Sequence, residues 1–317
     1  MAIFRKRTSF NLTNALIFLR AASQITTRPQ FGQIRSCKWW AGSTLNSGML
    51  ILIAAVLPAL ATSDAAPADA VKLPAPGVEY RVNVASPSRV PWVDANGWRI
   101  ERAPDRTYFY DVPETAAALA CAEAYAWAAK ALIHTTDSGA AAFRSMLQLL
   151  KSLPEASWPV MANIGVIDDG SSETGELMNL LMRRNLLYRV VTAPDPKLDL
   201  NVRLADYPKA DAGNPALLAQ KIRSQLGDDK RLVRLYGSEV VIARLVGNGE
   251  RARLHLVNYA NRPVNGLRVR VRGKWTRQEA RAYGAPQLKL RDVSVENDAT
   301  EFTIPEMSTY VAVDLAR

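Results

Sequence analysis

The spacing of apolar positions divides the chain beyond residue 77 into segments with different periods. Residues 78–112 alternate apolar and polar side chains at every second position, which predicts strands and loops. The dipeptide Asn96-Gly97 within this segment predicts a turn. Residues 114–132 and 143–153 have the composition and apolar spacing of helices, and Pro154 ends the second helix. This half of the chain therefore mixes strands with helices.

Residues 160–191 show the clearest pattern. An apolar strand at 160–167 precedes a polar loop, a helix at 173–185 and a second apolar strand at 188–191. Strand, helix and strand within about 30 residues form a βαβ unit, whose two strands run parallel. A strand at 201–204 and a helix opened by Asn214-Pro215 extend this α/β segment.

The pattern changes after residue 230. Seven or eight short segments alternate apolar and polar residues and are separated by turns rich in glycine and asparagine, which predicts an antiparallel β-sandwich. Arg268, Arg270 and Arg272 alternate with apolar residues in one of these segments. Such alternation predicts a solvated face opposite a buried face.

The N-terminal part has the residue pattern of an export signal. Residues 49–61 form a run of thirteen residues without charge, which is short for a membrane span of about 20 residues. The length is typical of the apolar core of a secretory signal, and the small residues that follow predict cleavage near residues 61–66. We therefore expect export to the periplasm or the extracellular space and no stable membrane span in the mature chain.

Residues 1–48 are unusually long for the basic region of such a signal. They contain seven Lys or Arg residues and no acidic residue. Three interpretations stay open, namely a start codon assigned too far upstream, a long basic n-region and an organelle-targeting segment. The domain boundaries expected from the whole pattern are a leader outside the fold at 1–65, a linker at 66–77, a mixed α/β segment at 78–155, an α/β domain at 156–230 and a β-sandwich at 231–317.

Composition supports a globular protein and limits its partners. Of 317 residues, 48% are hydrophobic and 22% charged, which excludes a disordered chain and a polytopic membrane protein. The net charge of +10 favours a polyanion partner at first sight. However, residues 66–317 contain 33 basic and 29 acidic residues, a balance that needs no nucleic acid.

Cysteine and histidine are too sparse for most metal or thiol chemistry. Cys121 is the one cysteine after the leader, so the mature chain has no internal disulfide, and its alanine-rich surroundings predict a small buried apolar residue. His134 and His255 lie far apart, and the chain has no C-x-x-C or H-E-x-x-H motif. We expect no metal and no cofactor, and structural roles for both histidines.

One segment contains side chains suited to a sugar ligand. Trp92, Asp94, Asn96 and Trp98 lie in the sequence W-V-D-A-N-G-W, where rings could bind C–H faces and polar groups could bind hydroxyls. The alternative is a turn with two packing tryptophans. Asp94 and Glu101 also suit a general acid and base, which glycosidases hold about 5–9.5 Å apart.

Further carboxylates follow the predicted strands. Asp168, Asp169 and Glu173 come after the strand at 160–167, at the edge of a parallel sheet where ligands bind. They could bind a cation or sugar hydroxyls, or they could form a turn that complements the helix dipole. Glu114 and Glu123 lie on the alanine-rich helix, where a carboxylate either has a raised pKa and a function or occupies a solvated stripe.

Two parts of the chain resemble the β-galactosidase-like glycoside hydrolases. RARLHLVNYANRPVNGLRVRV and TEFTIPEMSTYVAVDL resemble their small C-terminal β-domain, and PVMANIGVIDDGSSETGELMNLLMRRNLLYRVV resembles their domain similar to class I glutamine amidotransferases. The resemblance covers about residues 160–317. It implies α/β followed by all-β, with a flavodoxin-like or amidotransferase-like parallel sheet followed by an antiparallel β-sandwich.

The family's catalytic barrel does not fit into this chain. Only about 85 residues precede residue 160 after the linker, whereas a (β/α)8 barrel needs about 250, so we expect residues 78–155 to be a partial barrel remnant. The barrel's catalytic glutamates have no matching positions here, and catalytic residues are not assigned. The chain also lacks a Gly-x-Cys-x-Gly elbow and a partnered histidine, so we expect no amidotransfer.

The resemblance implies an exported, carbohydrate-associated protein that binds a glycan or assembles rather than catalyses. Its expected ligand is an oligosaccharide, and its expected partner is a second copy of the chain or a separate barrel-containing chain. Two alternatives stay open. One is a reduced but active glycosidase that uses Asp94, Glu101 or Asp168, and the other is a structural oligomerisation module without a ligand.

Overall fold

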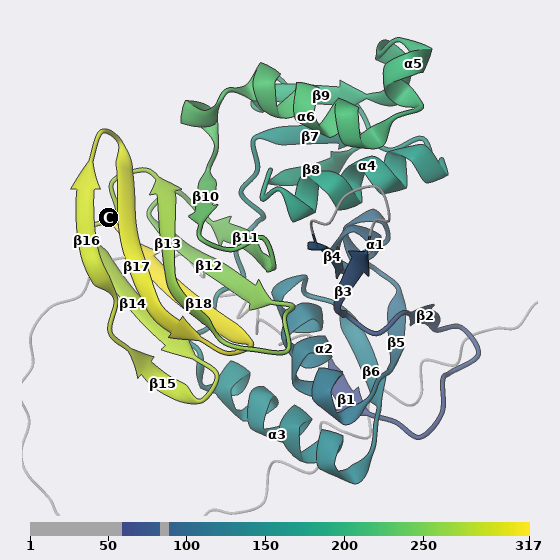
Figure 1. Cartoon of the computed structure of the whole chain (residues 1–317), viewed down its shortest axis with the longest axis vertical. Coiled ribbons are helices and arrows are strands. Elements are labelled where there is room, and N and C mark those ends of the chain that lie inside the picture. Colours follow the sequence, from purple (N-terminus) through teal and green to yellow (C-terminus); the bar gives the residue numbers. More distant parts are fainter. Residues whose placement is uncertain (1–58, 83–88) are drawn as a thin grey trace, which may run out of the picture. The chain divides into compact units, whose positions relative to one another are not determined.

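The structure, a computed structural model, describes residues 59–82 and 89–317, which belong to one unit of the chain (Figure 1). Its first sheet is parallel throughout and has the order β1-β6-β5-β2. The strands are β1 (Leu60–Thr62), β2 (Val71–Leu73), β5 (Thr107–Asp111) and β6 (Lys130–His134). Helices α2 (Glu114–Ala126) and α3 (Asp137–Ser152) follow β5 and β6. Helices and strands expected before residue 155 are therefore present, but the helix expected over 114–132 ends at Ala126, and residues 130–134 form β6.

The first strand lies inside the expected leader. Leu60 pairs with Ala131 and Thr62 with Ile133, so β1 adds an edge strand to the parallel sheet. This placement differs from the expectation that everything up to residue 65 lies outside the fold. A short extended segment can cover the open edge of β6 because that edge presents unpaired backbone groups. Residues 1–58, including most of the apolar run, lie outside the described residues.

A hairpin and a short helix connect β2 to β5. Strands β3 (Gly77–Val82) and β4 (Arg89–Asp94) pair antiparallel, and α1 (Gly97–Arg102) follows directly. The turn expected at Asn96-Gly97 is wrong, because Asn96 is the N-cap residue of α1 and the chain continues as a helix. The amide of Asn96 binds groups distant in sequence, a contact that the local turn pattern cannot reveal.

The second sheet is also parallel and confirms the predicted βαβ unit. Its order is β8-β7-β9, with β7 (Ile164–Ile167), β8 (Tyr188–Val191) and β9 (Leu200–Arg203). Helix α4 (Ser172–Arg183) connects β7 to β8, and α6 (Pro215–Leu226) follows β9. The shorter elements are η2 (Leu204–Asp206), α5 (Lys209–Ala212) and η3 (Asp228–Lys230). The expected cap is present, since Asn214 Oδ1 accepts a hydrogen bond from the Leu217 amide.

Two antiparallel sheets with the orders β10-β13-β17-β16 and β11-β12-β18-β14-β15 complete the chain. The strands are β10 (Val233–Tyr236), β11 (Val241–Gly247), β12 (Arg251–Asn258), β13 (Val264–Arg272), β14 (Arg277–Ala282), β15 (Ala285–Leu288), β16 (Arg291–Glu296), β17 (Ala299–Met307) and β18 (Tyr310–Ala316). Leu254, Val269 and Phe302 belong to one apolar core between the sheets. The predicted order, parallel sheets followed by an antiparallel sandwich, is therefore confirmed.

The outer face of the sheet that contains β12 packs against helix α2. Val257, Tyr259 and Tyr310 share an apolar core with the alanines of α2 and with Cys121. Cys121 is fully buried, as its surroundings predicted. Both faces of the sheet are therefore covered at β12, where the side chains from Ala252 to Asn258 are buried.

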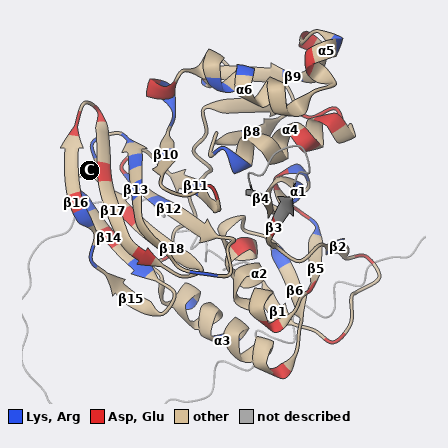
Figure 2. Ribbon diagram, viewed as in Figure 1, with Lys and Arg blue, Asp and Glu red and all other residues tan. Residues whose placement is uncertain are grey.

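Charge is spread over the molecule rather than gathered in one element. Figure 2 shows Lys and Arg together with Asp and Glu on the helices and on the antiparallel sheets. On β13 the predicted solvated face is present, since Arg268 is exposed and bound to Glu301, while Val269 is buried. Within the described ranges, no helix has the length and apolarity needed to cross a membrane.

Candidate functional site

The first tryptophan of the W-V-D-A-N-G-W segment contacts protein groups. Trp92 Nε1 donates a hydrogen bond to Asp94 Oδ1 at 3.0 Å. The Arg183 guanidinium of α4 lies 3.9 Å from the centre of the Trp92 ring, in a cation–π contact. One face of the ring and one carboxylate oxygen are thus already occupied.

Asn96 and Glu123 form part of a buried polar cluster. Asn96 is 1% exposed, and both its backbone amide and its side-chain amide donate to the Glu123 carboxylate. Tyr110 and Tyr259 donate their hydroxyls to the same carboxylate, at 2.9 and 2.8 Å. The solvated stripe considered for Glu123 is therefore wrong. Burial raises the pKa of Glu123, while the four donors oppose that shift.

Trp98 packs on helix α4, and Asp168 lies in the loop that precedes this helix. A Cβ atom added to Gly175 would lie 2.9 Å from the Trp98 ring, so the indole packs closely on α4. Arg102 binds Asp168 with two hydrogen bonds of 2.6 Å and donates a third to the carbonyl of Ser171. This bidentate contact lowers the pKa of Asp168 and fixes α1 against the loop before α4.

The remaining predicted carboxylates lie in the same loop and in the first turn of α4. Asp169 accepts hydrogen bonds from the backbone amide and the hydroxyl of Ser171, which lower its pKa to about 2. Glu173 is exposed and accepts from the Ser172 hydroxyl. The structure thus brings Trp92, Trp98 and Asp168 to α4, each with a protein partner. Their role in ligand binding remains a prediction.

A hollow with different side chains lies between the C-terminal ends of α2 and α3 and the outer face of β11 and β12. Its volume is about 480 Å³. We call it the helix-end cavity. It is lined by Tyr125, Ala126, Ala128, Lys151, Leu153, Pro154, Glu155, Ala156, Ser157, Trp158, Pro159, Val160, Arg244, Val246, Arg253 and His255. A cavity of this size, with several convergent polar groups, is typical of a small-molecule site.

Arg253 anchors one side of this cavity. Its Nε and Nη2 atoms lie 2.6 and 3.0 Å from the two carboxylate oxygens of Asp314. Nη2 also donates to the Pro154 carbonyl at 2.8 Å, and Nη1 lies 3.5 Å from the Tyr125 hydroxyl. Because one guanidinium contacts β18, α2 and the loop after α3, it ties these three elements together beside the cavity.

His255 is neutral and fixed by neighbouring rings. Its Nδ1 lies 2.7 Å from the Tyr310 hydroxyl, and the Tyr125 ring meets it edge-on at 5.8 Å between centroids. Burial lowers the pKa of His255 well below 6.5, and the charges of Arg253 and Arg244 lower it further. A neutral imidazole can offer a donor or an acceptor to an uncharged ligand.

Arg244, in another part of the wall, belongs to a buried ion pair. Arg244 Nη1 lies 2.5 Å from Glu101 Oε1, and both side chains are largely buried. Burial raises the pKa of Glu101, and the charge of Arg244 opposes this rise. Glu101 and Asp94 therefore bind different partners, Arg244 and Trp92. Their role as a general acid and base stays a prediction.

Partly exposed aromatic rings complete the cavity. Tyr125 and Trp158 are both half-buried, and Lys151 is exposed near them. Aromatic faces bind the C–H face of a sugar, while arginine, histidine and lysine bind its hydroxyls. Glu155 is the one carboxylate among the described residues that line the cavity. The lining is therefore better suited to binding than to two-carboxylate hydrolysis.

A larger cavity, of about 690 Å³, lies at the start of α2. Residues 75–78 and 258–262 form most of its lining. Its aromatic residue, Tyr259, is buried and has its hydroxyl bound to Glu123. This cavity has neither an accessible ring nor a carboxylate in its described lining, so the helix-end cavity is the stronger candidate.

Sequence reasoning missed the residues of the helix-end cavity. The alternation of Arg253, Leu254 and His255 does predict that the arginine and the histidine share one face of a strand. It does not predict that this face meets α2. Trp158, after the helix-ending Pro154, was a further signal in the sequence, since an aromatic residue in a loop is often exposed.

The sequence matches no protein-family model and no curated protein. Similar solved structures include alpha-L-fucosidase isoenzyme 2 from Paenibacillus thiaminolyticus, with a TM-score of 0.47 and 8% identity over 69% of this chain and 62% of that chain. A family 30 subfamily 8 xylanase from Clostridium acetobutylicum has a TM-score of 0.27 and 6% identity over 69% and 45%. A maltogenic alpha-amylase from Thermotoga neapolitana has a TM-score of 0.20 and 9% identity over 69% of this chain and 57% of that chain.

All three structures are glycoside hydrolases, and this chain spans less than two thirds of the length of each. The amidotransferase-like domain, the barrel remnant and the oligomer or barrel-containing partner stay predictions. In the part of the chain that the structure describes, no three His, Cys, Asp or Glu side chains are grouped to hold a metal ion.

Proposed function

We propose that this protein binds an oligosaccharide in the helix-end cavity and does not hydrolyse it. The observation that supports this most is the combination of two half-exposed rings, Tyr125 and Trp158, with the exposed Lys151 and the buried Arg253 and His255 around one hollow of about 480 Å³. A sugar presents apolar C–H faces and hydroxyl edges, and this lining offers a partner for each.

The polar groups of the cavity are held before a ligand arrives. Arg253 is bound by Asp314 and Arg244 by Glu101, so neither side chain must be ordered on binding. Pre-ordered groups reduce the entropy lost on association. Because both guanidinium charges are balanced by carboxylates, the wall favours hydroxyl groups over a strongly charged ligand.

Trp158→Ala tests the proposal. Oligosaccharide binding to the full chain is measured by titration calorimetry and by quenching of tryptophan fluorescence, with a panel of neutral and acidic oligosaccharides. Loss of ring stacking should weaken binding by about tenfold or more. Tyr236→Ala is the matched control, because Tyr236 is a partly exposed ring on β10, outside the cavity. It should bind as the wild type does.

Two results would contradict the proposal. One is a panel in which no oligosaccharide binds, and the other is a Trp158→Ala variant that binds as tightly as the wild type. Release of an aryl group from aryl glycosides by the purified protein would refute the non-hydrolytic part and favour a reduced glycosidase.

Export is the second part of the proposal. Cleavage within residues 61–66 would remove β1, so β6 would become an edge strand of the parallel sheet. N-terminal sequencing of the protein recovered from the periplasm or the medium should begin within or just after this range. Full-length protein retained in the cytosol would argue against a signal.

A further inference from the structure

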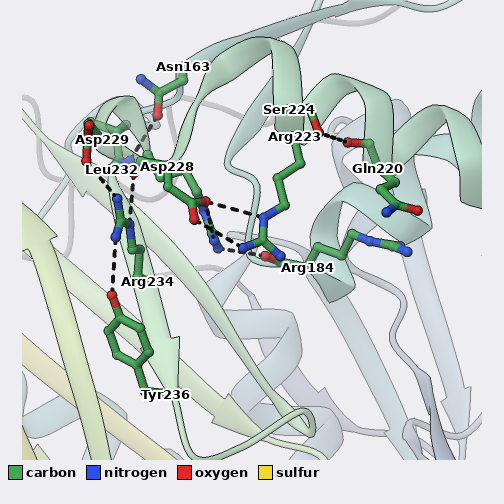
Figure 3. Close-up of polar contacts among 11 residues, drawn as sticks. Asn163, Arg184, Gln220, Arg223, Ser224, Asp228, Asp229, Leu232, Arg234 and Tyr236 are labelled. Atoms are coloured by element: carbon green, nitrogen blue, oxygen red, sulfur yellow. Dashed lines mark hydrogen bonds and ion pairs between the residues drawn. The ribbon is translucent and has the colours of Figure 1, made fainter.

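A group of arginines at the C-terminal end of α6 has fewer carboxylate partners than positive charges (Figure 3). We call it the arginine cluster. It consists of Arg184, Arg223, Arg231, Arg234, Asp228 and Asp229. The cluster thus contains four guanidinium groups and two carboxylates, an excess of positive charge.

Asp228 is shared by two of the arginines. Arg223 Nε and Nη2 lie 3.3 and 3.2 Å from its two carboxylate oxygens. Arg231 Nη1 lies 3.4 Å from Oδ1, and Arg231 Nη2 donates to the backbone carbonyl of Arg184. The Nε atom of Arg231 is buried and has no hydrogen-bond partner among the described residues. One carboxylate therefore balances two cations only in part.

Asp229 is occupied by Arg234. Arg234 Nη2 lies 3.2 Å from Asp229 Oδ1, and its other nitrogens bind the Asp228 carbonyl and the Tyr236 hydroxyl. Asp229 is fully exposed, so solvent weakens its contribution. Asp228 and Asp229 therefore form ion pairs with Arg223, Arg231 and Arg234, but not with Arg184.

Arg184 is the arginine left without an acidic partner. No carboxylate of residues 59–82 or 89–317 is paired with its guanidinium, which is half-buried. Burial lowers the pKa of Arg184, and the like charge of Arg223 lowers it further. Figure 3 shows the Arg184 side chain extending below α6 towards Gln220, and Arg223 descending from the same helix. The Arg184 guanidinium therefore lies near the exposed Gln220 amide, while the Arg223 guanidinium, on the same helix as Gln220, is bound to Asp228.

We propose that Arg184, Arg223 and Gln220 bind an oxyanion, namely a sulfate, phosphate or carboxylate group. A guanidinium presents a fork of N–H donors that matches the oxygens of such groups, and the amide supplies another donor. An anion here would relieve the repulsion between the two arginines. The same chemistry is available from a free inorganic ion and from a group on an acidic polysaccharide. This site is separate from the helix-end cavity.

Helix dipoles offer a simpler reason for arginines at these positions. Arg184 is the C-cap residue of α4, and Arg223 lies in the last turn of α6. A cation at a helix C-terminus stabilises the helix by about 0.3–1 kcal/mol. That role predicts lower stability on substitution but no specific response to an oxyanion. The response to the anion therefore distinguishes the two.

The test compares sulfate with chloride at equal ionic strength. The midpoint of thermal unfolding of the full chain is measured in both salts, for the wild type, Arg184→Gln and Arg203→Gln. Arg203 is an exposed arginine of β9, so its substitution removes the same charge at a different place. We expect sulfate at about ten times its Kd to raise the midpoint by about 2–4 °C in the wild type and in Arg203→Gln. Arg184→Gln should lose this shift.

Dextran sulfate and a polyuronate, each compared with neutral dextran, distinguish the two sources of the anion. Binding of these polymers that depends on Arg184, without a response to inorganic sulfate or phosphate, assigns the site to an acidic polysaccharide. A response to the inorganic ions alone assigns it to a free anion. A second variant, Arg223→Gln, is measured in the same way. Because only the difference between its unfolding midpoints in sulfate and in chloride is compared, a general loss of stability does not affect the result. No shift with any anion, or equal shifts in Arg184→Gln and the wild type, would overturn the proposal.

Discussion

Tyr259→Phe removes one of four hydrogen bonds to a carboxylate in the interior. Glu123 Oε1 accepts from the Tyr259 hydroxyl at 2.8 Å and from the Asn96 amide at 2.6 Å. Oε2 accepts from Tyr110 at 2.9 Å and from the Asn96 side chain at 3.1 Å. Four donors and no acceptor surround the carboxylate, an arrangement that suits its ionised form. Tyr259 is also the contact that ties the sandwich to α2 at this point.

The magnitude follows from the charge of the acceptor. A hydrogen bond to a charged group contributes about 1.5–3 kcal/mol to stability, and one to a neutral group about 0.5–1.5 kcal/mol. Burial raises the pKa of Glu123 above its ordinary value of 4.5. The folded state then binds the proton more tightly than the unfolded state, so ionisation lowers stability as the pH rises from 4.5 through the folded pKa, and acid in that window restores it. Removing a donor raises this pKa further.

Urea unfolding at about pH 8 and about pH 4.5 measures the effect. We expect Tyr259→Phe to lose about 1.5–3 kcal/mol at the higher pH, where more of Glu123 is ionised, and less at the lower pH. Tyr283→Phe is the matched control, since the Tyr283 side chain is half-buried and has no hydrogen bond in the described structure. It should lose less than about 0.5 kcal/mol. A loss below that value for Tyr259→Phe at pH 8, or a larger loss in acid, would refute the reasoning.

Three further substitutions or probes test other parts of the fold. Gly97→Ala should lose about 1–3 kcal/mol or more in urea unfolding, because the new Cβ would lie 2.2 Å from the buried Trp127 ring; an unchanged midpoint would contradict this packing. Burial raises the pKa of the Cys121 thiol to about 12, so an aromatic disulfide reagent at about pH 8 should label it only after unfolding, and rapid labelling of the native protein would argue against burial. Asp168→Asn should lose about 1.5–3 kcal/mol near neutral pH, where the carboxylate bound by Arg102 is ionised. Arg102 lowers the pKa of Asp168 below 3.8, so the wild type's advantage is complete above that pH and disappears as the pH falls through the lowered value; a difference that grows in acid would be inconsistent.

Local patterns in the sequence predict the elements of this fold well where neighbouring residues decide them. Asn214 caps α6 through the Leu217 amide, a contact within four residues. The βαβ unit follows from apolar runs whose lengths suit buried parallel strands. Strand β7 begins at Ile164, later than the apolar run, because Val160 pairs with Val246 of the sandwich. That difference comes from a partner distant in sequence.

The candidate site depends on such distant partners, which explains why local reasoning did not find it. The Arg253 guanidinium contacts Pro154, 99 positions away, and Tyr125, 128 positions away. Tyr259 and Glu123 are 136 positions apart. A periodic pattern shows that a side chain faces one side of a strand, but the element covering that side is decided by tertiary packing. The predicted sandwich was therefore correct while the residues facing α2 went unnoticed.

The polar residues singled out from sequence and those of the helix-end cavity differ in what satisfies them. Both carboxylate oxygens of Asp168 accept hydrogen bonds from Arg102, and the Asn96 side chain is buried and donates to Glu123. Each of these residues therefore already has protein partners. In the cavity, Arg253 is likewise held by Asp314, yet it borders an open volume together with the Trp158 ring. A ligand gains from a polar group that is ordered and still accessible, since ordering reduces the entropy lost on binding and access leaves room for contact. In the helix-end cavity the accessible groups are the half-buried Tyr125 and Trp158 rings and the exposed Lys151, whereas Arg253, which is 1% exposed, orders the wall behind them.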